Sequence, residues 1–226
     1  MFKVELHDLG LIEYGNAWQM QKELFHLAIQ EKIDGKHPKH HLLVCEHPHV
    51  YTLGKSANQS NLLLSQAELQ QKSIDVFDIE RGGDITYHGP GQIVVYPIFD
   101  LEPMHLGVKK FVFNIEECII GALRVYGIES ERIEDRIGIW IGKGTANERK
   151  IAAIGIKCSR HVTMHGLALN VNTDLGLFNN IIPCGIQDKA VCSMESELNR
   201  KIDMAELKQV LLDQFSTIFE LKLLSI

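Results

Sequence analysis

Apolar residues recur at intervals of three and four along three stretches of the chain, and this period predicts amphipathic helices. The first stretch begins at Asn16, which can accept hydrogen bonds at a helix N-terminus, and ends at Gly35. The second covers residues 108–126 and places Cys118 on its apolar face. The third follows Asp203 and Glu206, which have the spacing of a capping box. We therefore expect three helices that each pack one face against a core.

Shorter apolar or alternating runs predict β-strands between these helices. They cover residues 41–46, 47–54 after a proline turn, 74–79, 93–99, 137–141, 151–156 and 162–171, the last broken by Gly166. A second capping box, Ser65 with Glu68, marks a short helix start. The irregular order of strands and helices indicates an α+β fold with a mixed sheet rather than a doubly wound parallel one. No linker or repeat divides residues 1–226, so we expect a single domain.

Composition narrows the class of protein. The chain is 45% hydrophobic and 23% charged, as in ordinary soluble proteins, and has no apolar run long enough for a membrane helix. A formal net charge of −6 argues against nucleic-acid or anionic-membrane partners, because these select basic surfaces. The N-terminus lacks a signal-peptide pattern, and five cysteines without paired spacing indicate reduced thiols. We therefore expect a cytoplasmic protein.

The chain contains eleven histidines, and several lie within residues 36–41, KHPKHH. A metal-binding tract is one interpretation of this run. We favour a solvated loop, because no carboxylate or thiol at ligand spacing accompanies these histidines. The sequence therefore predicts no metal site.

Residues 81–92, RGGDITYHGPGQ, combine four glycines and a proline with Arg81, Tyr87 and His88. Glycines let the backbone approach a ligand closely, so a phosphate cradle is the first hypothesis. The chain has neither the P-loop pattern nor the dinucleotide fingerprint, which argues against a nucleotide cofactor. A glycine-rich hairpin and a substrate-binding loop remain as interpretations.

Lys150 opens an apolar strand run, and Cys184 lies in a tight Pro-Cys-Gly loop further along the chain. A thiolate can take an acyl group from a thioester, and a nearby lysine can stabilise the thiolate and move protons. A free cysteine is more often a small buried apolar residue, but proline and glycine neighbours suit an exposed loop. Acyl transfer through Cys184 is therefore one hypothesis, and a structural thiol is the other.

Six segments, in order and with compatible gaps, resemble the lipoyl(octanoyl) transferase family of lipoate synthesis. They are EHPHVYTLG at 46–54, RGGDITYHGPGQ at 81–92, YPIFDL at 96–101, KIAAIG at 150–155, MHGLALN at 164–170 and PCGI at 183–186. The resemblance implies the catalytic fold of the biotin/lipoate protein ligase superfamily, a single domain with a mixed sheet flanked by helices.

The resemblance also implies roles for particular residues. The family's acyl-carrying cysteine corresponds to Cys184, and the lysine that lowers its pKa corresponds to Lys150. The acyl-binding segments correspond to Arg81, Gly82, Gly83, Asp84, Ile85, Thr86, Tyr87 and His88, to Ala153, Ile154 and Gly155, and to Gly166, Leu167 and Ala168. His47 and His165 lie inside matched motifs, as supporting residues or as hydrogen-bonded structural histidines. Cys192 stands where the family usually has threonine, which places a second thiol near the site.

The resemblance implies a two-step octanoyl transfer that needs no cofactor. Cys184 would take the octanoyl group from octanoyl-acyl carrier protein, and a lysine ε-amine of a lipoyl domain would remove it as an amide. The acceptors would be lipoyl domains of 2-oxoacid dehydrogenase complexes and the glycine cleavage H protein. Residues 151–156 and 167–169 would line an acyl tunnel or simply belong to the core.

Two other functions stay open at this point. One is an ATP-dependent lipoate or biotin protein ligase on the same fold, and the other is a non-catalytic protein that binds lipoyl domains. For the transferase, an acidic carrier protein would need a local basic patch on this acidic chain, and Arg149, Lys157 and Arg160 are the candidates.

Overall fold

The computed structural model describes residues 1–182 and 190–226. Within these ranges the chain forms a nine-stranded mixed sheet, a three-stranded sheet and five α-helices. The helices are α1 (Tyr14–Ile33), α2 (Gln66–Gln71), α3 (Val108–Val125), α4 (Met194–Leu198) and α5 (Met204–Ile218). This architecture confirms the predicted α+β fold with a mixed sheet flanked by helices, and it adds a smaller sheet that the sequence did not predict.

The large sheet has the order β12-β1-β2-β6-β10-β9-β8-β7, with β11 paired to β9. Its strands are β1 (Phe2–Leu11), β2 (His40–Glu46), β6 (Gln92–Ile98), β7 (Glu131–Ile133), β8 (Arg136–Ile141), β9 (Arg149–Ser159), β10 (Val162–Asn170), β11 (Ala190–Val191) and β12 (Leu221–Ser225). Strand β1 runs parallel to both β2 and β12, and β11 runs parallel to β9. The small sheet has the order β4-β3-β5, from β3 (Val50–Leu53), β4 (Asp75–Asp78) and β5 (Ile85–His88).

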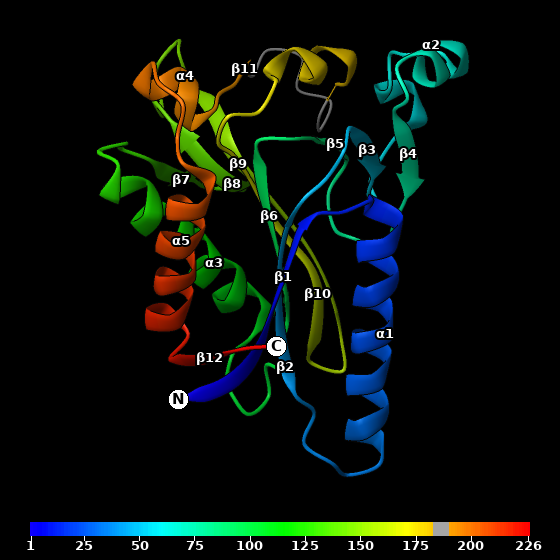
Figure 1. Ribbon diagram of the computed structural model, residues 1–226, viewed down its shortest axis with the longest axis vertical. Helices are drawn as coiled ribbons and strands as arrows, with labels where there is room; N and C mark the ends of the chain where they lie inside the picture. Colours follow the sequence, from blue (N-terminus) through cyan, green and yellow to red (C-terminus); the bar gives the residue numbers. More distant parts are fainter. Residues whose placement is uncertain (183–189) are drawn as a thin grey trace.

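Helices cover both faces of the large sheet, with α1 on one side and α3 and α5 on the other (Figure 1). The largest core cluster lies between the sheet and the α3–α5 pair, and a second lies beneath α1. The buried residues of α1 recur every three or four positions, as predicted, and include the polar Gln21. The apolar face of α3 is buried as expected, with Cys118 inside the core. No helix in the described part of the chain is long and apolar enough to cross a membrane.

The predicted start of α1 is wrong by three residues, because the expected cap was Asn16. The helix begins at Tyr14 with Glu13 at the N-cap position, and no side chain caps it. The ring of Tyr14 packs 5.2 Å from the rings of both His47 and Phe77, so tertiary packing fixes this end of the helix. The capping box of Ser65 and Glu68 is confirmed. Asp203 caps α5 by accepting the backbone N–H groups of Ala205 and Glu206, but the structure gives no return contact from the Glu206 side chain among the described residues.

Two other local predictions need correction. Gly166 does not break its strand, since β10 stays paired with β9 from Val162 to Leu169. A Cβ atom at Gly166 would lie 1.9 Å from the carbonyl oxygen of Val95, so this glycine lets β6 and β10 approach each other. The expected solvated loop at 36–41 also ends early, because His40 and His41 begin β2 and are buried.

Candidate active site

A cavity of about 420 Å³ opens between the glycine-rich loop that precedes β5, the first half of β9 and the start of α3. Its wall is largely apolar and includes Val112, Ile137 and Trp140. Lys150 is the cationic side chain of β9 that lines it. The predicted apolar residues at the start of β9 therefore line a cavity as well as contributing to the core.

A second, smaller cavity of about 50 Å³ lies next to the first and shares lining residues with it, among them Arg81, Ala153 and Ala168. Its remaining wall includes Tyr14, His88 and His165 together with the apolar Val94 and Leu167. The two cavities together have a largely apolar lining, with Lys150 in the larger one and the two histidines in the smaller one. Such a lining suits an apolar substrate.

The predicted substrate-binding residues lie along these cavities with one exception. Tyr87 lines neither, because it faces the core of the small sheet and its hydroxyl pairs with His49 Nδ1 at 2.7 Å. Thr86 and His88, on the opposite face of β5, line the smaller cavity. The residues that do line one or both cavities are Arg81, Gly82, Gly83, Asp84, Ile85, Thr86, His88, Ala153, Ile154, Gly155, Gly166, Leu167 and Ala168. Their role in binding substrate stays a prediction.

Gly54 and Gly155 let the backbone of the 81–92 segment lie close to the neighbouring strands. The Gly82 amide donates to the Ile156 carbonyl of β9 at 3.1 Å. A Cβ atom at Gly155 would lie 2.8 Å from the Gly82 carbonyl oxygen, and one at Gly54 would lie 2.3 Å from that of Gly83. The loop therefore forms the cavity wall with its backbone, and side chains at these contacts would push it away.

Two charged residues hold the same loop in place. Arg81 is 9% exposed, and its Nη2 donates to the backbone oxygen of Thr52 at 2.7 Å. Asp84 accepts from the Asn61 amide at 2.7 Å and from the backbone N–H of Ile85 at the same distance. Asp84 is therefore bound to the protein through both carboxylate oxygens, which indicates a structural role.

Lys150 lies near the start of β9, where this strand pairs with β8 on one side and with β11 on the other. Its Nζ lies 3.3 Å from the Ile137 carbonyl oxygen and 4.7 Å from the centre of the Trp140 ring. Trp140 is the cross-strand partner of Lys150, so the ring forms a flat support for the lysine side chain. An aromatic face and a carbonyl oxygen both favour the charged ammonium form of a lysine.

Cys184, the predicted nucleophile, falls within 183–189, outside the described residues. The described chain stops at Ile182, whose N–H donates to the Asn61 carbonyl at 2.8 Å, and resumes at β11. There Val191 pairs with Lys150, and the Cys192 amide donates to the Lys150 carbonyl at 2.9 Å. At Ala190 and Val191 the described chain therefore lies beside the strand of Lys150.

Cys192 is poorly suited to nucleophilic attack. It is 2% exposed and packs in the main core cluster. Burial raises the pKa of its thiol well above the ordinary value, with Glu197 adding to the effect and Arg149 opposing it. The second thiol near the site is therefore an apolar core residue.

The three histidines of the matched motifs have different environments. His47 is fully buried, donates from Nδ1 to the Ile12 carbonyl at 2.8 Å and accepts the Tyr96 hydroxyl at Nε2. Burial lowers its pKa to about 4, and it lines neither cavity. His47 is therefore a structural histidine.

His88 and His165 face the smaller cavity. His88 donates from Nδ1 to the Gln92 side chain at 2.7 Å, and burial lowers its pKa to about 3. Burial lowers the pKa of His165 to about 3 as well. Neither ring nitrogen of His165 has a hydrogen-bond partner among the described residues. His165 thus offers a neutral ring with unused polar atoms to whatever occupies the small cavity.

Sequence reasoning missed a buried chain of hydrogen bonds that links His88 to Cys192, the residue after β11. Beyond His88, the Gln92 amide donates to Asn170 Oδ1 at 2.9 Å, and the Asn170 amide donates to the Cys192 carbonyl at 3.0 Å. Gln92 and Asn170 also line the larger cavity. Both stand inside matched motifs, so their buried amides could have been singled out from the sequence.

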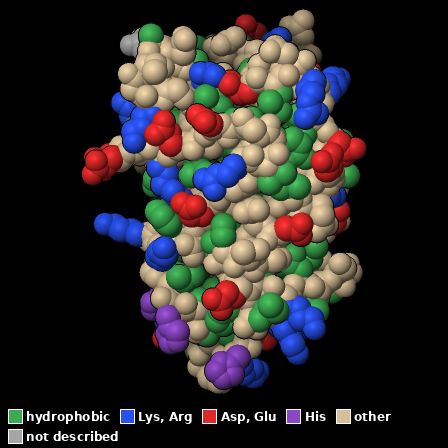
Figure 2. Space-filling view, turned by 90° about the vertical axis from the view of Figure 1, so that its left-hand side faces the viewer, with side chains coloured by type: hydrophobic (Ala, Val, Ile, Leu, Met, Phe, Trp, Pro, Cys, Tyr) green, Lys and Arg blue, Asp and Glu red, His purple; other side chains and the backbone are tan. Residues whose placement is uncertain are grey.

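The expected basic patch of Arg149, Lys157 and Arg160 does not form. Arg149 begins β9 and Arg160 follows its last residue, so the two lie roughly 36 Å apart at the rise of an extended strand. Arg149 is bound to Glu197 at 2.6 Å, and Lys157 lies 3.9 Å from Glu80. On the face that carries α3 and α5, acidic and basic side chains are interspersed (Figure 2).

Comparisons with known proteins agree with this geometry. The family model for the lipoyl protein ligase A/B catalytic domain matches residues 13–216. A Bacteroides thetaiotaomicron protein named octanoyltransferase is 49% identical over 207 residues, covering 92% of this chain and 91% of the relative. A Flavobacterium johnsoniae protein of the same name is 48% identical and covers 96% and 97%.

Solved structures of lower identity share the fold. A bipartite lipoate protein ligase from Thermoplasma acidophilum superposes with a TM-score of 0.74 at 15% identity, covering 100% of this chain and 88% of that one. The biotin protein ligase from Aquifex aeolicus gives 0.54 at 12% identity, covering 97% and 70%. Given the match over residues 13–216 and relatives almost half identical over most of their length, the chain belongs to the lipoyl protein ligase A/B catalytic domain family.

Proposed function

We propose that this chain is an octanoyltransferase of protein lipoylation, which moves an octanoyl group from octanoyl-acyl carrier protein to a lysine of a lipoyl domain. The observation that carries the proposal is the apolar cavity lined by Lys150, in a chain whose relatives at 48–49% identity are named octanoyltransferases. The acceptors in this proposal are lipoyl domains of 2-oxoacid dehydrogenase complexes and the glycine cleavage H protein.

In the first step, the Cys184 thiolate attacks the thioester carbonyl of the octanoyl carrier. A new bond forms between sulfur and the acyl carbon, the carrier's carbon–sulfur bond breaks, and the carrier leaves as a thiolate that takes up a proton. A thiol with a pKa near 8.5 is only a few per cent ionised at pH 7. The Lys150 ammonium would raise that fraction by stabilising the thiolate.

In the second step, the acceptor amine attacks octanoyl-Cys184 and expels the cysteine thiolate as the amide forms. The incoming ammonium, whose pKa in water is near 10.4, first releases one proton to solvent, and its nitrogen loses a second proton as the amide forms. Lys150 is the group that we assign to accept this second proton, after it has given a proton to the departing carrier thiolate. One lysine thus carries a proton in both half-reactions, and the net exchange of thioester for amide needs no nucleotide.

The larger cavity would hold the acyl chain during both steps. Each methylene that leaves water for an apolar site contributes about 0.8 kcal/mol, so four buried methylenes would supply roughly 3 kcal/mol of binding. The side chains of Val112, Ile137 and Trp140 offer such a surface. The end of the chain would lie near the smaller cavity, where His88 and His165 stand among apolar residues such as Leu167.

A direct comparison of acyl donors tests this proposal against the ligase alternative. Purified protein is given a lipoyl domain with either octanoyl-acyl carrier protein alone or octanoate with ATP and Mg²⁺, and the acceptor's mass is followed. We expect acceptor modification with the carrier alone and none with octanoate and ATP. The reverse pattern identifies an ATP-dependent ligase, and no modification with either donor favours a non-catalytic binding protein.

A further inference from the structure

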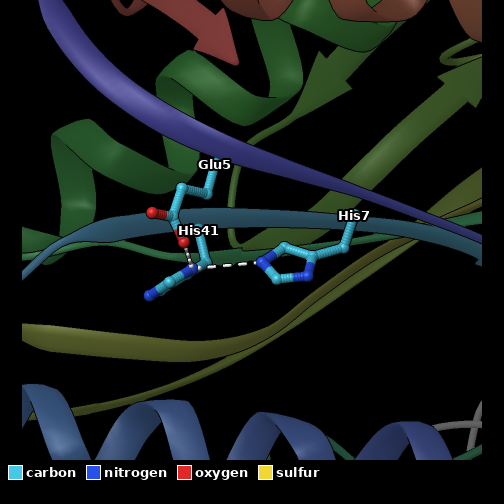
Figure 3. Close-up of side chains that lie close together, drawn as sticks. All are labelled: Glu5, His7 and His41. Atoms are coloured by element: carbon cyan, nitrogen blue, oxygen red, sulfur yellow. Dashed lines mark hydrogen bonds and ion pairs between the residues drawn. The ribbon is translucent and has the colours of Figure 1, made fainter. Parts of the chain in front are cut away.

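Three potential metal ligands meet where β1 lies beside β2, away from the cavities described above. His7 Nε2 lies 3.1 Å from His41 Nδ1, and Glu5 Oε2 lies 3.4 Å from the same nitrogen. Figure 3 shows the three side chains converging from the two strands. All three ligand atoms fall within 4.8 Å of one another.

Strand pairing creates this cluster. In the parallel register of β1 and β2, Glu5 lies opposite His41 and His7 lies opposite Leu43. Alternate residues of a strand share a face, so Glu5, His7 and His41 project from the same side of the sheet. The histidine-containing tract at 36–41 has no carboxylate at ligand spacing in the sequence, but β1 supplies one through space.

The separations suit a small divalent cation. Four ligands about 2.0–2.1 Å from a tetrahedral ion are roughly 3.3–3.4 Å from each other, since each edge of a tetrahedron is about 1.6 times its radius. His41 Nδ1 lies 3.1 Å from His7 Nε2 and 3.4 Å from Glu5 Oε2, and both distances are close to this ligand–ligand separation. Two imidazole nitrogens and one carboxylate oxygen are donors that Zn²⁺ accepts, and water completes such a site.

We propose that Glu5, His7 and His41 form a site for a divalent transition metal of the Zn²⁺ type, which cross-links β1 to β2. The site is partly open to solvent, because the Glu5 side chain is 23% exposed whereas that of His41 is 8% exposed. An ion can therefore enter from the Glu5 side and exchange with the medium. The site is separate from the acyl-transfer chemistry and does not depend on it.

Lys39 lies on the Glu5 side of the cluster. Lys39 binds Oε1 at 2.6 Å and leaves Oε2 facing His41. The positive charge of Lys39 repels a divalent cation at this site, so replacing Lys39 by a neutral residue should tighten metal binding.

Metal titration of the full-length chain tests the site. Because a reactive thiol also binds zinc, the titrations use a Cys184→Ser background, in which calorimetry with ZnCl₂ should give one ion per chain. Glu5→Gln and His7→Gln should each weaken zinc binding by about tenfold or more, and Lys39→Gln should strengthen it. His37→Gln is the matched control, because this exposed histidine belongs to the same tract but not to the cluster.

Thermal unfolding with and without zinc provides a second measurement, because a ligand that binds only the folded state raises the midpoint. The zinc-dependent rise should be present in the His37→Gln protein and reduced in the Glu5→Gln protein, whose side chain keeps its shape. Equal zinc affinities in the Glu5→Gln, His7→Gln and His37→Gln proteins would overturn the proposal. A dissociation constant weaker than ~1 mM in the Cys184→Ser background would overturn it as well.

Discussion

Replacing Gly155 by alanine tests whether backbone contact between the glycine-rich loop and β9 shapes the cavity. The added methyl group would lie 2.8 Å from the Gly82 carbonyl oxygen and 3.0 Å from Arg81 Cδ. Both distances are shorter than a normal carbon contact, so the loop must move. That movement strains the hydrogen bond from the Gly82 amide to Ile156.

The size of the effect follows from three contributions. Overpacking costs roughly 1–3 kcal/mol, and the weakened hydrogen bond costs about 1 kcal/mol. Alanine also restricts the unfolded chain, which returns ~0.4–1 kcal/mol of stability. The net loss in the free energy of unfolding should therefore be ~1–3 kcal/mol, which for a chain of this length lowers the thermal midpoint by about 3–10 °C.

Urea and thermal unfolding of Gly155→Ala measure this loss, and Gly82→Ala is the matched control for stability. A Cβ atom at Gly82 would lie 3.5 Å from the Ile156 oxygen, an ordinary contact, so its stability should stay within ~1 kcal/mol of wild type. Because Arg81 and Gly82 line the larger cavity, Gly155→Ala should also raise KM for the octanoyl carrier. Wild-type stability in Gly155→Ala, or equal losses in both variants, would refute this reasoning.

Three further predictions concern the site. Lys150→Met should slow alkylation of Cys184 by iodoacetamide at pH 7 and shift the pH profile upward, since the ammonium no longer stabilises the thiolate; coinciding profiles would remove Lys150 from the mechanism. Burial lowers the pKa of His165 to about 3, so below about pH 6.5 the unfolded chain binds more protons and stability falls. His165→Gln should flatten that fall by up to ~1.4 kcal/mol per pH unit, and an unchanged slope in urea titrations would contradict the assignment. Ala168→Leu, at a residue that lines both cavities, should raise KM for octanoyl carrier about tenfold by excluding roughly two methylenes. It should leave a butyryl carrier unaffected, whereas equal effects on both carriers would mean that the chain does not reach Ala168.

The sequence predicted elements whose apolar residues are periodic or contiguous. Helix α3 and the central strands β6, β9 and β10 were predicted, because residues close together in the sequence show which positions are apolar and buried. Strands β1 and β12 were missed, because β1 carries Glu5, His7 and Asp8 and both strands are fixed by pairing with distant residues. Local periodicity carries no signal for such pairing.

The candidate site was predicted unevenly for the same reason. The motif residues of β5, β9 and β10 line the cavities as a set, whereas Tyr87 does not, because alternate residues of β5 face opposite sides. Trp140 was missed, although it lies in a predicted strand that comes directly before the strand of Lys150 in the sequence and pairs with it. The unpartnered ring of His165 could not be read from the sequence, since it depends on the packing of β10 against α1.

Intact mass spectrometry of the protein mixed with octanoyl-acyl carrier protein, without ATP or a lipoyl domain, tests covalent acyl transfer most directly. Peptide mapping then assigns any adduct to Cys184 or to the buried Cys192. We expect one octanoyl group per chain, on Cys184, that disappears when a lipoyl domain is added and that never forms on Cys184→Ser. Transfer to the lipoyl domain by Cys184→Ser at the wild-type rate, or an adduct on Cys192 alone, would contradict the mechanism.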